Sequence, residues 1–451
     1  MKLNKEIFKS YDIRGIYPDE LNEENAREIS LLFLSLVCKR TAKEPKDLKI
    51  VIGRDIRDSS QALEKIMMET LVSKGVNIDN IGLMSVDVIY FAVGKLDYDG
   101  GVMVTASHNP GKYGGYKMVS RGVEWVRGVE LWDHQNERKD FPNLDDGKIK
   151  SIDVWKGYLE HIFSFIDKDK IKPMKIVVDS GNGMAGIMIS KIVEFLPQIE
   201  LVPLFFEPDG NFPNRNPNPL TEGAADELCK KVKEEKADLG FIYDADADRV
   251  FLIDENGKFL RGDQTLLVLM KPILKANPGV GVVYNLICSK NVRETVEKMG
   301  GKAIRSEVGY VNMGAHMKNN NGIMGGEVSA HFSFRDNYYA DSGFIAFLLA
   351  LESVSEDGFK LSEFIRENEN WHRANEVNLS IDDKTLALNN IRENYKDNIL
   401  DEIDGITIEF KDWWFNVRPS NTEPLLRVTI ECRNESDIDK KVEEVLNIVK
   451  S

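Results

Sequence analysis

Cysteine is scarce in this sequence, and long hydrophobic runs are missing from it. The four cysteines lie far apart without any Cys-x-x-Cys pair, which argues against a disulfide framework or a zinc site and fits reduced thiols. They are Cys38, Cys229, Cys288 and Cys432. The longest apolar stretch, 29–38, is interrupted by two serines and is too short to span a bilayer. Because the first ten residues contain no apolar signal core, we expect a cytoplasmic protein without a membrane partner.

An excess of positive charge is also lacking. The formal net charge of −15 argues against a general nucleic-acid surface, so nucleic acid is not an expected partner. Any anionic substrate must then be held by local basic groups against the mean field of the protein. A chain of 451 residues is too long for one core and predicts about three or four domains.

The order of apolar runs and turn signals predicts a series of α/β units. In the first unit, strands are expected at 49–54 and 77–83 and a helix at 60–75. The second has strands at 175–179, 201–206 and 237–243, and the third has strands at 281–285 and 302–305. The last segment groups strands at 376–380, 406–410, 413–417 and 425–431 between helices at 385–393 and 437–449, which is typical of an α+β domain.

One stretch, VMVTASHNPGKYGGYK at 102–117, places a serine where catalytic residues often lie. The run 102–104 predicts a buried strand and Asn-Pro-Gly predicts a turn, so Ser107 is expected on a loop at a strand end. The alternative is a serine that only caps a turn. A hydrolase elbow is excluded, because Thr105 and Asn109 stand where that motif requires glycine. His108 is expected to be a poor proton acceptor for Ser107, since successive side chains of an extended segment point opposite ways.

Three alternating aspartates, Asp244, Asp246 and Asp248, follow an expected strand. If that segment is extended, the three carboxylates lie on one side, and such hard oxygen ligands suit Mg²⁺. An EF-hand is disfavoured because Arg249 stands where that loop requires glycine. An aspartate-nucleophile phosphatase and a solvated acidic turn remain open alternatives.

Two further stretches contain groups that suit a phosphosugar. Glu327 and Ser329 lie two residues apart and can face one ligand as hydrogen-bond acceptor and donor. Arg418 begins the run RPSNTEP, in which an arginine can grip phosphate in bidentate fashion and neutral side chains add donors. Residues 208–219, PDGNFPNRNPNP, form a stiff loop of a length that usually has a function.

Taken together, the strings YDIRG, TASHNP, PDGNFP, DADADR, GEVSAH and RPSNTEP resemble, in identity and in order, the motifs of the α-D-phosphohexomutases. The resemblance covers the whole chain. It implies three similar α/β domains with mixed sheets and a smaller C-terminal α+β domain around a central active-site cleft. The expected ranges are 1–148 with the serine loop, 149–254 with the metal loop, 255–367 with the sugar loop and 368–451 with the phosphate loop.

The same resemblance implies roles for individual residues. Ser107 carries a phosphoryl group, Lys117 is a general acid or base, and His108 and Arg249 assist. The metal ligands are Asp244, Asp246, Asp248 and an oxygen on Ser107. The substrate-binding residues are Tyr11, Arg14, Glu327, Ser329, His331, Arg418, Ser420, Asn421 and Thr422. Because a free lysine is mostly protonated near neutrality, base work by Lys117 requires a lowered pKa.

The family reaction interconverts hexose 1-phosphate and hexose 6-phosphate with Mg²⁺ and with a hexose 1,6-bisphosphate as intermediate and activator. The resemblance is strongest to bacterial phosphomannomutase/phosphoglucomutase, so mannose and glucose phosphates are the expected substrates, with a monomer or weak homo-oligomer. The departures Val86-Asp87, Ile287, Tyr310 and Ala330 leave the sugar open. The alternatives are a glucosamine phosphate mutase, a phosphatase using Asp244, and a calcium- or sugar-phosphate-binding module.

Overall fold

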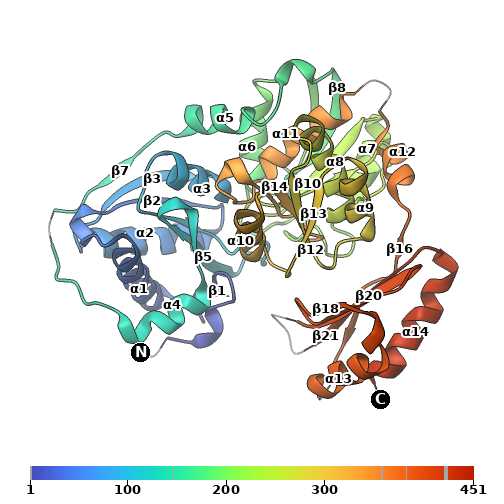
Figure 1. Cartoon of the computed structure of the whole chain (residues 1–451). Helices are drawn as coiled ribbons and strands as arrows, with labels where there is room; N and C mark the ends of the chain where they lie inside the picture. Colours follow the sequence, from blue (N-terminus) through green and yellow to red (C-terminus); the bar gives the residue numbers. More distant parts are fainter. Residues whose placement is uncertain (1–2, 145, 357–358, 382, 421–424, 451) are drawn as a thin grey trace.

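The computed structural model describes residues 3–144, 146–356, 359–381, 383–420 and 425–450. Four β-sheets, each with its own helices, follow one another along the chain (Figure 1). We call these units domains 1 to 4. The model confirms the predicted fold class, with mixed sheets in the first three domains. Within the described ranges, no helix combines the length and the apolar character that crossing a membrane requires.

Domain 1 is built on a sheet of order β1-β5-β4-β2-β3-β7, with β6 beside β5. Its strands are β1 (Ile13–Ile16), β2 (Lys49–Arg54), β3 (Asn77–Leu83), β4 (Gly100–Val104), β5 (Tyr113–Ser120), β6 (Glu124–Val126) and β7 (Ile149–Ser151), and its helices are α1 (Glu23–Thr41), α2 (Asp58–Val72), α3 (Val86–Lys95) and α4 (Gly128–His134). Alternation along β2 sends Ile50 and Ile52 to the core under α1 and α2, and Val51 to the opposite face, where α3 packs. Helices therefore cover both faces, and β4 is completely buried.

Domain 2 has a four-stranded sheet of order β11-β10-β8-β9. Its elements are α5 (Trp155–Phe163), β8 (Met174–Asp179), α6 (Ala185–Val193), β9 (Ile199–Leu204), α7 (Asp226–Glu235), β10 (Leu239–Tyr243) and β11 (Val250–Ile253). Strand β8 runs parallel to β9 and β10, whereas β11 is antiparallel to β10. The segment between β10 and β11 is therefore a tight reversal at one sheet edge.

Domain 3 repeats this arrangement in the order β13-β12-β14-β15. Its elements are α8 (Gly262–Ala276), β12 (Gly281–Asn285), α9 (Lys290–Lys298), β13 (Lys302–Ser306), α10 (Tyr310–Asn320), β14 (Gly322–Gly326), β15 (Phe332–Phe334), α11 (Gly343–Val354) and α12 (Leu361–Asn368). Strands β12, β13 and β14 are parallel and β15 is antiparallel. The reversal from β14 to β15 contains Glu327 and Ser329, so it corresponds to the aspartate reversal of domain 2.

Domain 4 differs from the other three, because its sheet is antiparallel. The order is β16-β21-β20-β19-β18, with β17 beside β21. Its elements are β16 (His372–Arg373), β17 (Val377–Leu379), α13 (Lys384–Asn394), β18 (Ile399–Asp401), β19 (Ile406–Glu409), β20 (Trp413–Pro419), β21 (Leu426–Cys432) and α14 (Ile438–Val449). Figure 1 shows this unit in orange and red at the end of the chain.

The hydrophobic cores do not follow the domains one to one. A single buried cluster runs through α3 of domain 1, the sheet of domain 2, and α8 and α11 of domain 3. Helix α11 joins two of these units, since Phe344 stacks on Tyr243 at 5.4 Å and Phe347 packs on Phe241 at 4.6 Å. Domain 4 has a core of its own. The first three domains are thus held by continuous apolar packing, and domain 4 is attached mainly by other contacts.

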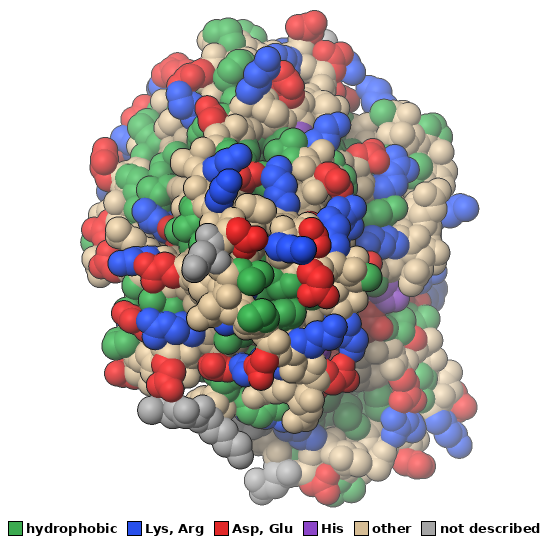
Figure 2. Space-filling view, turned by 90° about the vertical axis from the view of Figure 1, so that its left-hand side faces the viewer, with side chains coloured by type: hydrophobic (Ala, Val, Ile, Leu, Met, Phe, Trp, Pro, Cys, Tyr) green, Lys and Arg blue, Asp and Glu red, His purple; other side chains and the backbone are tan. Residues whose placement is uncertain are grey.

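The surface of domain 1 carries acidic and basic side chains interspersed with one another (Figure 2). Ion pairs account for part of this pattern: Arg40 lies 2.6 Å from Glu130, and Lys43 lies 2.8 Å from Asp99. The four cysteines are unpaired.

Candidate active site

Ser107 lies three residues beyond the end of β4, on a loop, as the sequence predicts. Its side chain is buried, with 2% of the residue exposed. The backbone at Ser107 has a φ of 49°, in the left-handed region that few residues other than glycine adopt. The Ser107 amide donates to the Thr105 hydroxyl at 2.9 Å. An unusual backbone held by a specific hydrogen bond is a feature of functional loops.

The expectation for His108 is wrong. Ser107 Oγ and His108 Nδ1 are 3.2 Å apart, within hydrogen-bond distance. The expectation assumed an extended segment, but the positive φ of Ser107 turns both side chains to the same side. Burial, Arg249 and Arg14 lower the pKa of His108 well below its usual value. The imidazole is therefore neutral near neutral pH and can exchange a proton with the serine.

The three aspartates come together at the end of β10, although not for the predicted reason. Their ligand oxygens lie within 4.8 Å of one another. The segment is a turn, in which Ala247 has a φ of 64°, and not an extended strand. Asp246 Oδ1 and Asp248 Oδ1 are buried without a hydrogen-bond partner among the described residues. Such orphaned carboxylate oxygens fit a divalent cation with oxygen ligands, so this cluster could bind a metal.

Mutual repulsion among these carboxylates affects their pKa values. Burial and the charge on Asp248 raise the pKa of Asp244 to about 8. Burial also opposes ionisation of Asp248, but Lys117, His331 and Arg249 outweigh it and hold the pKa of Asp248 below its usual value. A bound cation would remove the repulsion that raises the pKa of Asp244.

Lys117 lies on β5 opposite Met103 of β4, and its ammonium group reaches the aspartates. Its Nζ is 2.8 Å from Asp246 Oδ2 and also contacts Asp248. Burial alone would lower the pKa of Lys117, but the two carboxylates outweigh burial and raise the pKa well above its usual value. This is opposite to the lowered pKa that base work requires, and the two carboxylates hold the ammonium in its protonated form.

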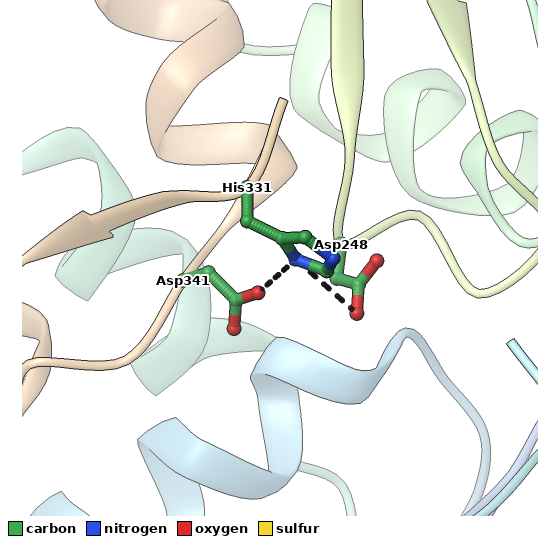
Figure 3. A group of neighbouring side chains, drawn as sticks. All are labelled: Asp248, His331 and Asp341. Atoms are coloured by element: carbon green, nitrogen blue, oxygen red, sulfur yellow. Dashed lines mark hydrogen bonds and ion pairs between the residues drawn. The ribbon is translucent and has the colours of Figure 1, made fainter. Parts of the chain in front are cut away.

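Arg249 and His331 connect the aspartates to domain 3. The backbone and Nε of Arg249 both donate to Asp244, at 3.2 and 2.9 Å. His331 Nδ1 lies 2.5 Å from Asp341 Oδ2 and 3.9 Å from Asp248 Oδ2 (Figure 3). Burial lowers the pKa of His331, but both carboxylates outweigh it and raise the pKa above its usual value. By ligand type His331, Asp341 and Asp248 could also hold a metal.

Arg14 lies beside the serine loop, whereas Tyr11 reaches domain 3. The Tyr11 hydroxyl donates to the carbonyl of Val308 in domain 3 at 3.1 Å. Arg14 donates to Asp12 at 2.6 and 2.8 Å and to the Asn109 side chain at 2.7 Å. Strand β1 therefore places one cation directly beside the Ser107 loop.

Glu327 and Ser329 contact each other, with Ser329 Oγ donating to Glu327 Oε2 at 3.0 Å. The other Glu327 oxygen accepts from the Gly309 amide at 2.7 Å. Tyr310, the next residue, packs against the rings of Tyr11 at 5.4 Å and His331 at 5.1 Å. Its hydroxyl is buried without a hydrogen-bond partner in the part of the chain that the structure describes. The sugar loop and Tyr310 thus lie next to each other.

The phosphate loop begins at Arg418, near the end of β20. Arg418 is almost fully buried, and its Nε has no hydrogen-bond partner within the described ranges. Burial lowers its pKa, although Asp404 and Glu376 oppose this. The guanidinium is within electrostatic range of Tyr11 and Glu327. Ser420 follows it, and Asn421 and Thr422 lie outside the described residues.

Some residues that organise the site carried no signal in the sequence. Asp341 supports His331, but it belongs to no motif. Asp55 accepts from the hydroxyls of Thr105 and Ser60 at 2.6 and 2.5 Å, and the neighbouring Arg57 contacts the serine loop. Asp55 and Arg57 belong to the run GRDIR at 53–57. The spacing of that run alone does not predict what their buried charged groups contact.

These observations define a class of protein: a four-domain α/β protein whose loops carry a buried serine, an acidic cluster and several basic side chains. The comparisons identify the family. The descriptions "Phosphoglucomutase/phosphomannomutase, alpha/beta/alpha" domains I, II and III match residues 5–130, 156–257 and 261–370, and the description of the C-terminal domain matches residues 376–448.

Full-length relatives agree. The chain is 37% identical to "Phosphohexose mutases" of Xanthomonas campestris pv. campestris (strain B100), covering 98% of this chain and 99% of that one. It is 36% identical to "Phosphomannomutase" of Vibrio cholerae, covering 98% of each. A crystal structure of a phosphoglucomutase/phosphomannomutase family protein from Burkholderia thailandensis superimposes with a TM-score of 0.87 at 28% identity, covering 99% and 98%. The chain belongs to the phosphoglucomutase/phosphomannomutase family of the α-D-phosphohexomutase superfamily, and it is a phosphohexomutase-type isomerase.

Proposed function

We propose that this enzyme interconverts the 1- and 6-phosphates of mannose and of glucose through a phosphoserine at Ser107. The observation that supports this most directly is the convergence of Lys117 and the three aspartates from two domains beside Thr105, whose hydroxyl accepts from the Ser107 amide. In the first half-reaction, the 6-hydroxyl of a hexose 1-phosphate attacks the phosphorus, and the bond to Ser107 Oγ breaks. The product is a hexose 1,6-bisphosphate. After the bisphosphate reorients, Ser107 attacks its other phosphate and a hexose 6-phosphate leaves.

The proton exchange is assigned to two residues. In each half-reaction the attacking hydroxyl loses a proton and the departing oxygen gains one. Lys117, which its carboxylate partners keep protonated, is the proposed proton donor to the departing oxygen. His108, neutral and 3.2 Å from Ser107 Oγ, is the proposed acceptor of the proton that the attacking hydroxyl loses, from the sugar in the first half-reaction and from the serine in the second. Before the next transfer, His108 releases this proton to solvent and Lys117 regains one, so that each half-reaction balances. Arg249 holds Asp244 in place by two hydrogen bonds.

Asp244, Asp246 and Asp248 would hold Mg²⁺ together with an oxygen of the Ser107 phosphate. When bound, the ion supplies positive charge to the phosphoryl group during transfer. Its fit rests on the orphaned oxygens of Asp246 and Asp248. Hexose 1,6-bisphosphate would then serve as the activator, because it can phosphorylate Ser107.

The substrate would be held from several domains. Glu327 and Ser329 are the proposed partners of the sugar hydroxyls, and Arg418, with Ser420, Asn421 and Thr422, holds the phosphate that does not react. Tyr11, Arg14 and His331 complete the proposed substrate-binding set. Arginine suits the phosphate because its donors form a planar fork.

The reorientation explains why both hexoses are expected as substrates. Turning the ring over exchanges the places of the 3- and 4-hydroxyls, so one Glu327–Ser329 pair can serve both poses. The 2-hydroxyl has no such counterpart, so a protein group that grips it in one pose loses it in the other. Mannose and glucose differ only at that carbon. An N-acetyl group there would need room in two places, which makes aminosugar phosphates poorer substrates.

The test combines mass spectrometry and a variant. The intact mass and a phosphopeptide map of the purified protein should place a phosphate on Ser107, and Ser107→Ala should lack both the phosphate and turnover. Ser190→Ala, which removes a hydroxyl that donates to the carbonyl of Gly186 within α6, is the matched control and should keep both. Turnover above a few per cent in Ser107→Ala would exclude Ser107 as the carrier. Release of inorganic phosphate by that variant would instead favour a phosphatase using Asp244.

A further inference from the structure

Residues 208–219 lie between the serine loop of domain 1 and the aspartate turn of domain 2. Their prolines and asparagines exclude regular structure, and no helix or strand includes them. Two of the prolines, Pro217 and Pro219, are buried together with Phe212. A segment that is both stiff and anchored along its length can transmit position between two loops.

At one end the segment covers Arg57, which holds the serine loop. Arg57 is completely buried and donates to the carbonyl oxygens of Ser107 at 2.5 Å, Asn109 at 2.6 Å and Pro110 at 2.7 Å. The ring of Phe212 lies 4.9 Å from the guanidinium carbon. An aromatic face over a desolvated cation is attractive and fixes the plane of the guanidinium.

The two backbones also touch directly. A Cβ added to Gly210 would lie 2.8 Å from the Arg57 Cα and 2.9 Å from the Ile56 carbonyl oxygen. A Cβ added to Gly111, four residues after the serine, would collide with the carbonyl oxygen of Gly210. Glycine is required on both sides of this contact, because a side chain on either residue would push the segment and the serine loop apart.

At the other end the segment is fixed beside the first metal-binding aspartate. Arg215 donates to Asp179 Oδ1 at 2.8 Å and to the carbonyl oxygen of Tyr243 at 2.6 Å. Tyr243 is the residue before Asp244. Asn214 adds a hydrogen bond to Asn182 at 2.9 Å. Apart from the carbonyl of Asn216 within the segment, every hydrogen bond of Arg215 goes to the end of β8 or of β10.

We propose that residues 208–219 act as a strut that sets the position of Ser107 relative to the aspartates, with Arg57, Phe212 and Arg215 as positioning residues. The inference rests on the proposed function, because it assumes phosphoryl transfer between these loops. The serine belongs to domain 1 and the aspartates to domain 2, so their spacing depends on contacts between two units. Displacing a reacting group by about 1 Å can lower a rate by about a hundred-fold, which makes a rigid connection worthwhile.

The experiment is a double-mutant cycle between the two ends. Phe212→Ala removes the ring that packs on the Arg57 guanidinium. Arg215→Lys removes the planar guanidinium that bonds Asp179 and Tyr243. Each should lower kcat by roughly ten- to a hundred-fold with KM changed by less than about threefold. The double variant should be only slightly slower than the slower single variant, because the strut is already broken. Phe212→Leu, which keeps an apolar cover, should recover part of the activity and serves as the second variant if Phe212→Ala does not fold.

The control is Leu220→Ala, one residue beyond the segment, with a side chain that is 50% exposed and should leave kcat unchanged. Multiplicative effects in the cycle, or kcat values equal to that of the control, would overturn the strut. Single-turnover loss of phosphate from Ser107 locates the defect in the chemical step. The proposed function fails separately, if Ser107 carries no phosphate and Ser107→Ala stays active. In that case the same double-mutant cycle still tests the strut. Its readouts are kcat and the Mg²⁺ concentration that gives half-maximal rate.

Discussion

Asp87 gives the most quantitative prediction. Its carboxylate is buried on α3 in the core that the first three domains share. Ser85 donates to one oxygen at 2.5 Å, while Tyr158 of domain 2 and Ser342 of domain 3 donate to the other at 2.7 and 2.5 Å. Burial raises the pKa of Asp87 to about 6 from an ordinary 3.8, although the three hydroxyls oppose the rise. The structure thus places an ionisable group, without a cation among its hydrogen-bond partners, where three domains meet.

The sign of the stability effect follows from linkage. The folded chain binds the Asp87 proton more tightly than the unfolded chain does, so the contribution of Asp87 is fully present below pH about 4 and is lost as pH rises through 6. A shift of about two pKa units corresponds to about 3 kcal/mol. Asp87→Asn is neutral at every pH. The free energy of unfolding of the wild type, relative to the variant, should therefore fall by about 3 kcal/mol between pH 4 and pH 7.5.

Urea unfolding of both proteins, followed by tryptophan fluorescence at half-unit steps over this range, measures the difference. Subtraction cancels the other carboxyl groups that titrate in the same range. Asp133→Asn, an exposed substitution on α4, should give a flat difference and serves as the control. A flat curve for Asp87→Asn would refute the raised pKa, and a difference that grows with pH would refute its sign.

Three further predictions concern the site. Asp246→Asn removes one ligand charge, so the Mg²⁺ concentration for half-maximal rate should rise and the maximal rate should fall; unchanged values in a metal titration would exclude the site. Arg418→Ala should lower kcat/KM roughly ten- to a hundred-fold or more in steady-state assays, since each charge-assisted hydrogen bond contributes about 1.5–3 kcal/mol. Mannose 1-phosphate and glucose 1-phosphate should differ by less than about a hundred-fold in kcat/KM, and a preference beyond about 10⁴ would mean that C2 is read directly.

Local patterns were sufficient for elements that are apolar and bounded by turn signals. Strands β2, β3 and β12 begin and end at the predicted residues. Strands β1 and β5 gave no such signal, because glycines occupy the middle of one and the start of the other. The apolar run 29–38 is too short to span a membrane, and in the structure it is the buried part of α1. A sequence pattern shows burial more readily than it shows what a segment packs against.

The motifs name candidate site residues but not their geometry. They name the serine, the lysine and the aspartates, and the structure shows that Lys117 contacts Asp246 and Asp248. The geometry depends on single backbone torsions, which the motifs do not reveal. A positive φ at Ser107 brings His108 to the hydroxyl, and one at Ala247 closes the turn that gathers the aspartates. Contacts between segments far apart in the chain, such as Arg57 with the serine loop, have no local signature.

The proposed binding of anions by a chain with a net charge of −15 is plausible because every domain contributes a buried or half-buried basic side chain. These side chains are Arg14 and Lys117 from domain 1, Arg249 from domain 2, His331 from domain 3 and Arg418 from domain 4. In a buried site with low effective dielectric, these nearby charges outweigh distant surface carboxylates, which water and salt screen. The same argument explains the carboxylates among them: Asp12, Asp244 and Asp341 each hold one cation in position. Because no single domain supplies the whole set, the proposed anion site requires all four domains.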